Sequence, residues 1–121
     1  MEKELQSIVR QVLAQVPTLL AGIPKEGVDY HYSYLEGDIS SIYGEGWEFT
    51  LISKPSLCEN EIANGFHRLT IDMYHLPSPY KCTRLLKRGT RNEIEEYLCS
   101  SQCEEDIINA IPNQIECLED V

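Results

Sequence analysis

The residues best suited to chemistry are five cysteines and three histidines: Cys58, Cys82, Cys99, Cys103, Cys117, His31, His67 and His75. No Cys-x-x-Cys pair occurs, and no histidine follows a cysteine at zinc-ligand spacing. Cys99 and Cys103 are four residues apart, which would place them on one face of a helix. Together with Cys117 they could form a three-thiolate site, but free cysteines more often pack as small apolar residues.

Catalytic patterns are missing from the sequence. There is no His-Glu-x-x-His motif, no Gly-x-Ser-x-Gly elbow, no phosphate-binding loop and no dinucleotide-binding glycine pattern. A cysteine–histidine dyad formed by folding stays open as an alternative. We therefore expect no catalytic residue, no metal and no cofactor.

The charge is strongly unbalanced, with 20 acidic against 10 basic residues and a formal net charge of −10. Such a chain repels nucleic-acid phosphates and anionic membrane surfaces, so neither is an expected partner. It favours a basic protein partner instead, because opposite fields accelerate encounter. The N-terminus lacks a continuous apolar stretch and a small-residue cleavage site, which predicts a cytoplasmic protein.

A basic cluster within residues 81–91 contains five bases and no acid. Arg84, Lys87, Arg88 and Arg91 could bind a phosphate or carboxylate near a helix that begins at Thr90. The alternative is that these cations pair with the acidic segment that follows, because residues 92–121 contain nine acids and no base.

Acids and tyrosines are the candidate partner-binding residues. They are Glu95, Glu96, Glu116, Glu119 and Asp120 in the C-terminal segment, and Tyr30, Tyr32 and Tyr34 in one expected strand. The acids could form a surface for a cationic partner, or they could be a solvated helix face. The tyrosines could anchor an interface on an open sheet face, or they could belong to the core.

Hydrophobic periodicity predicts the elements that position these residues. Apolar spacing predicts a helix over 3–16, ended by Pro17. Alternation predicts strands over 28–34, 38–43, 47–52, 68–74 and 80–87, with a turn at Glu36-Gly37. Residues 54–67 are expected to be mainly a loop, with a short hairpin at Asn64-Gly65 as the alternative.

Two capping boxes predict C-terminal helices that begin at Thr90, with Glu93, and at Ser101, with Glu104. Residues 1–121 thus form a single α+β domain of two layers: an N-terminal helix, an antiparallel meander of about five strands, and two or three C-terminal helices. The helices should cover one face of the sheet and leave the other to solvent or a partner.

The segment Leu85-Leu86-Lys87-Arg88-Gly89-Thr90-Arg91-Asn92-Glu93-Ile94-Glu95-Glu96-Tyr97-Leu98 resembles a strand, Lys-x-Gly-Thr turn and capped helix of small acidic bacterial proteins. Some of these are grouped with immunity proteins of polymorphic or type VI toxin systems. Gly89, Thr90 and Glu93 match as structural positions only. The resemblance implies a non-catalytic, cytosolic inhibitor that occludes a toxin's active site. The alternatives are a small-ligand or enzyme domain with an anion site near Arg84 and Arg88, and a structural subunit of a bacterial assembly.

Overall fold

The computed structural model describes residues 2–23, 33–40, 47–76, 80 and 82–113. Its elements, in chain order, are α1 (Glu2–Leu13), α2 (Val16–Ala21), β1 (Leu35–Ser40), β2 (Glu48–Pro55), α3 (Glu59–Ala63), β3 (Phe66–Tyr74), β4 (Thr83–Thr90), α4 (Arg91–Leu98) and α5 (Ser101–Asn113). The α+β class, with an N-terminal helix, antiparallel strands and C-terminal helices, is as predicted, whereas α3 between β2 and β3 was not predicted.

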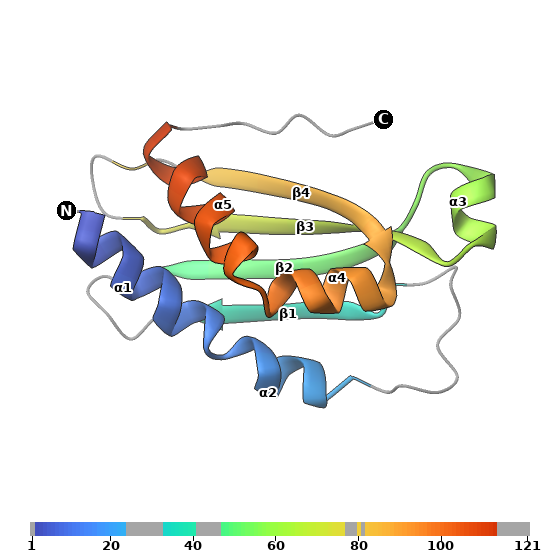
Figure 1. Cartoon of the computed structure of the whole chain (residues 1–121), viewed down its shortest axis with the longest axis horizontal. Coiled ribbons are helices and arrows are strands. Elements are labelled where there is room, and N and C mark those ends of the chain that lie inside the picture. Colours follow the sequence, from blue (N-terminus) through green and yellow to red (C-terminus); the bar gives the residue numbers. More distant parts are fainter. Residues whose placement is uncertain (1, 24–32, 41–46, 77–79, 81, 114–121) are drawn as a thin grey trace.

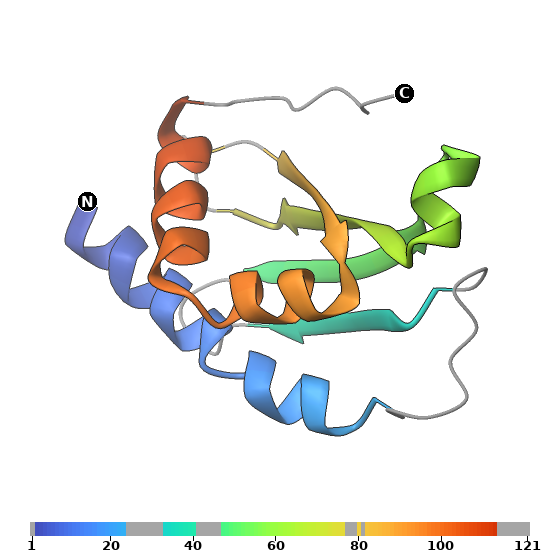
Figure 2. The same cartoon turned by 45° about the vertical axis from the view of Figure 1, so that its right-hand side comes forward.

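The strands form one antiparallel meander in the order β1-β2-β3-β4. Figure 1 shows α1, α2, α4 and α5 on one side of this sheet, and Figure 2 shows the same arrangement after a 45° turn. Helix α3 lies at one end of the sheet, where β2 ends and β3 begins. No helix in the described ranges is long and apolar enough to cross a bilayer.

The core lies between the sheet and the helices. Alternation along β3 buries His67, Leu69, Ile71 and Met73, while the residues between them stay partly exposed. Helix α1 contributes an apolar stripe of Leu5, Ile8, Val9 and Val12 at helical spacing. Both periodicities are visible in the sequence, and the sheet and helix that they predict form this core.

The sheet has four strands in the described residues, so the prediction of about five was wrong. Most of the expected 28–34 strand lies outside the described residues, and Ser33 and Tyr34 are not in a strand. The expected turn at Glu36-Gly37 was also wrong, because both residues lie inside β1, opposite Ile52 and Leu51. Of the expected 38–43 strand, residues 38–40 are in β1 and the rest lies outside the description.

The first helix ends three residues earlier than predicted, at Leu13, and Pro17 does not end a helix. Pro17 instead lies in the first turn of α2, where a missing backbone N–H costs no hydrogen bond. Leu19 and Leu20 of α2 then pack against the core.

Residues 54–67 are not a loop. Strand β2 continues to Pro55, α3 covers Glu59–Ala63, and β3 begins at Phe66. The Asn64-Gly65 pair does not form a hairpin turn: Asn64 caps the C-terminus of α3, and Gly65 follows with φ 76°. A positive φ just after a helix is the usual use of glycine at that position.

The capping box at Thr90 and Glu93 is confirmed. The Glu93 N–H donates to Thr90 Oγ1 over 3.3 Å, and the Thr90 N–H donates to Glu93 Oε1 over 3.3 Å. For α5 the side chain that accepts belongs to Ser100, one residue before the expected cap, because Cys103 N–H donates to Ser100 Oγ over 3.4 Å. Pro112 lies in the last turn of α5.

Candidate functional site

The four predicted anion-binding cations do not converge on one point. Successive residues of a strand point to opposite faces, so Arg84 and Arg88 lie on the open face of β4 while Lys87 lies on the helix-covered side. Arg84 Nε is 2.6 Å from Asp72 Oδ1 on β3. Arg88 Nη1 is 2.9 Å from Glu61 Oε1 on α3.

The other two cations contact the acidic helices. Lys87 Nζ lies 3.4 Å from Asp106 Oδ2 of α5, and Arg91 Nε lies 3.9 Å from Glu95 Oε2 of α4. Lys87 and Arg91 thus pair with the acidic segment that follows, as the pairing alternative predicts, whereas Arg84 and Arg88 pair with carboxylates of β3 and α3 that precede the cluster. The four residues are thus divided between the two faces of β4 and the start of α4.

Tyr34 is buried, with 8% of its surface exposed. Its ring lies 4.8 Å from the Arg91 guanidinium and makes an edge contact of 4.9 Å with the ring of His67. Burial raises the pKa of its phenol to about 12. Tyr34 therefore belongs to the core rather than to an open face, and Tyr30 and Tyr32 lie outside the described residues.

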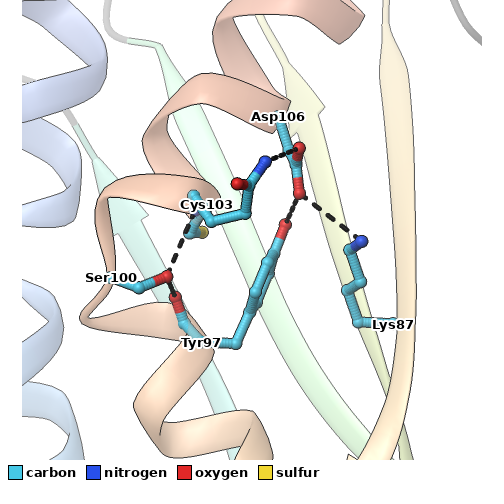
Figure 3. A network of polar contacts seen from close by, with 6 residues as sticks. Lys87, Tyr97, Ser100, Cys103 and Asp106 are labelled. Carbon is cyan, nitrogen blue, oxygen red and sulfur yellow. Dashed lines mark hydrogen bonds and ion pairs between the residues drawn. The ribbon is translucent and has the colours of Figure 1, made fainter.

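A polar network joins β4, α4 and α5 on the helix-covered side (Figure 3). The Tyr97 hydroxyl donates to Asp106 Oδ2 over 2.5 Å, and Gln102 Nε2 donates to Asp106 Oδ1 over 2.8 Å. Lys87 Nζ contacts the same carboxylate and lies 5.1 Å from the Tyr97 ring centroid. The Asp106 carboxylate thus contacts side chains of α4, α5 and β4. These contacts fix how α4 and α5 pack on β4.

The network contains no activated nucleophile. Burial, together with the Asp106 charge, raises the pKa of the Cys103 thiol to about 12, so this thiol is protonated at neutral pH. Burial and the hydrogen bond to Asp106 likewise hold the pKa of Tyr97 well above its usual value. No group of three potential metal ligands is found among the described residues. The arrangement fits a structural role better than a catalytic one.

The hollows that could accept a partner lie along the helices. One open groove, of about 470 Å³, lies between α2 and α4. Its α2 wall is Pro17, Leu20 and Ala21, and its α4 wall is Glu95, Glu96 and the C-cap residue Cys99. A second hollow of about 310 Å³ shares Pro17 and Cys99 with the first and runs on between α1 and the start of α5. We call these two hollows together the helical groove.

The helical groove has an apolar side and an acidic side. Pro17 and Ala21 are exposed on α2, and Glu96 is exposed on α4. Further along, Glu104 lines the second hollow and accepts from Arg10 Nε over 2.6 Å. A cationic group attached to an apolar body matches these two sides.

Two of the predicted partner-binding residues, Glu95 and Glu96, lie in the helical groove. Glu116, Glu119 and Asp120 lie outside the described residues. The apolar side, formed by Pro17, Leu20 and Ala21, was not predicted, although the apolar run around Pro17 was its signal. Comparison of the chain with protein-family models, with curated proteins and with solved structures gives no match.

Proposed function

We propose that this chain is a non-catalytic protein-binding module, an immunity-type inhibitor that covers a cationic surface of a toxin. The observation that carries the proposal is the helical groove, in which an apolar α2 wall faces an acidic α4 wall. The net charge of −10 supports the same class of partner, because it attracts a basic surface over long range.

The two walls of the helical groove would make different contacts with the partner. Glu95 and Glu96 attract a lysine or arginine of the partner, while Leu20, Ala21 and Pro17 remove an apolar group from water. Because Arg91 already lies 3.9 Å from Glu95, the exposed Glu96 is the better attachment point for an incoming cation. The partner's cleft is then occluded by a rigid helical surface rather than altered chemically.

The thiols fit a reducing compartment. Cys58, Cys82, Cys99 and Cys103 are all free, and three of them are exposed. Exposed free thiols persist where glutathione and thioredoxin keep them reduced, which supports a cytoplasmic location for the proposed inhibitor.

Co-expression with the product of the adjacent reading frame, followed by gel filtration, tests the proposal. We expect the two proteins to elute as one complex, and Glu95→Gln with Glu96→Gln to weaken it, most strongly at low salt. Glu59→Gln with Glu105→Gln is the matched control, because both residues are exposed and neither lines the groove. Separate elution of the wild-type proteins, or equal weakening by both pairs, would contradict the proposal.

A further inference from the structure

The helical groove has carboxylates at both ends and uncharged side chains between them. Glu95 and Glu96 line it at α4, and Glu104 lines the hollow between α1 and α5. The middle of the groove is lined by apolar or small side chains, among them Leu13, Ala14, Pro17, Leu98 and Cys99. By charge alone, a segment with a cation at each end and an apolar middle would fit such a groove.

The α1–α2 side of the groove sets its length. The lining residues Arg10, Ala14, Pro17 and Ala21 recur at helical spacing, and α2 continues roughly in the direction of α1 (Figure 1). At a rise of about 1.5 Å per residue, the stretch from Arg10 to Ala21 covers about 16 Å. An extended chain of about five residues has the same length. The groove therefore matches a short peptide segment of a partner rather than a single side chain.

The two ends of the groove differ because Arg10 occupies one of them. Arg10 Nε donates to Glu104 Oε1 over 2.6 Å, and the two side chains are 62% and 20% exposed. Since the fold holds Arg10 beside this carboxylate, Arg10 competes with an incoming cation at a high effective concentration. Glu96, at the other end, is exposed to solvent. The groove thus offers a solvated carboxylate at α4 and a paired one at α5.

We propose that the helical groove binds a peptide segment with one terminal cation and otherwise apolar residues, and that Arg10 determines this specificity. The cation lies at Glu96, and the apolar residues lie along Pro17 and Leu13 toward Arg10. A second cation at the far end meets the Arg10 guanidinium and finds Glu104 already paired, so it adds little affinity. This inference rests on the proposed function, because it names the kind of partner segment that the same groove accepts.

Two synthetic peptides, blocked at both ends, test this specificity: Arg-Ala-Leu-Ala-Leu and Arg-Ala-Leu-Ala-Arg. NMR titration at low, constant ionic strength measures both affinities from the amide shifts of Ala14, Ala21 and Cys99. For the wild type we expect saturable shifts and affinities within about twofold of each other. Arg10→Gln releases Glu104 and should strengthen binding of the two-cation peptide about three- to fivefold, with the one-cation peptide unchanged.

Three further variants separate the role of Arg10 from a general effect of charge. Arg10→Lys keeps a cation at this end and should behave as the wild type. Adding Glu104→Gln to Arg10→Gln should abolish the gain for the two-cation peptide. Lys3→Gln is the matched control, because Lys3 is an exposed cation of α1 that does not line the groove. Its substitution should change neither affinity.

Equal strengthening by Lys3→Gln and Arg10→Gln would show a general charge effect and overturn the inference. A wild-type protein that binds neither peptide, or that already binds the two-cation peptide more than threefold more tightly, would overturn it too. Failure of the proposed function is seen separately, as separate elution of the wild-type protein and its partner. Thermal unfolding of each variant confirms that the compared proteins are folded.

Discussion

Leu19 occupies the space that a side chain at Gly37 would fill. A Cβ atom on Gly37 would lie 2.7 Å from Cδ1 of Leu19 and 3.3 Å from its Cδ2. Glycine inside a strand weakens the strand but permits close approach, and here it lets α2 lie against β1. One wall of the helical groove thus depends on a residue with no side chain.

Gly37→Val should destabilise the protein by about 1–3 kcal/mol, because the new methyl groups collide with Leu19. Urea unfolding measures the loss. Leu19→Ala removes the collision. The double variant should therefore be more stable than the sum of the two single losses predicts. If the stability losses of the two substitutions simply add, the contact with Leu19 is not what limits the size of the residue at position 37.

Asp106→Asn should cost about 1–2 kcal/mol at pH 7. Burial alone would raise the pKa of Asp106, but hydrogen bonds from Tyr97 and Gln102 and the Lys87 charge together hold it below its ordinary value of 3.8. A depressed folded pKa gives stability that is present above the unfolded pKa and lost as the pH falls through the folded one. The difference between wild type and variant should therefore shrink below about pH 4.

Urea unfolding across that pH range checks this expectation. Glu105→Gln is the control, because Glu105 lies on the same helix and is exposed, and its substitution should stay within about 0.5 kcal/mol. A wild-type advantage over Asp106→Asn that persists undiminished into acid would refute the role given to the ionised carboxylate.

Cys103 should react far more slowly with iodoacetamide at pH 8 than Cys58, Cys82 and Cys99. Cys103 is buried and its pKa is raised to about 12, whereas the other three are exposed. Mass spectrometry of tryptic peptides after timed labelling resolves each site. Fast labelling of Cys103 in the folded protein would mean that the network of Figure 3 opens readily.

The raised pKa of Cys103 also predicts how the stability of the fold changes at alkaline pH. A raised folded pKa gives stability that is complete below the unfolded pKa, ordinarily 9.0, and lost as the pH rises from there toward about 12. We expect the urea midpoint to fall over this range. A midpoint that stays constant there would contradict the protonated, buried thiol.

Thr90→Ala should destabilise the protein by about 1 kcal/mol, because it removes the oxygen that accepts from the Glu93 N–H. Thr90→Ser keeps this acceptor and should retain most of the stability. Chemical unfolding of both variants makes the comparison, and an equal loss for the two would mean that the methyl group, not the cap, is important.

The elements with strong local signals could be predicted from the sequence. The stripe of α1, the alternation of β3 and the capping box of α4 each specify one structure by themselves. Gly37 and Asn64-Gly65 were misinterpreted because glycine permits several conformations. In both cases a neighbour decides the outcome: Leu19 packs over Gly37, and α3 ends at Ala63.

The candidate sites were predictable only in part. Glu95 and Glu96 were identified because acids concentrate after residue 91, but the facing wall on α2 depends on tertiary contact. The alignment of Lys54, Arg68 and Arg88 across β2, β3 and β4 appears only when the strand register is known. Of these three residues, only Arg88 was in the predicted basic cluster.

Thr90 is both the last residue of β4 and the N-cap of α4, so no linker separates strand from helix. An insertion or deletion of one residue at this junction would turn α4 by about 100° about its axis. Glu95 and Glu96 would then leave the groove while Ile94 and Leu98 left the core. We therefore expect insertions and deletions to be tolerated at other connections of the chain but not at this junction.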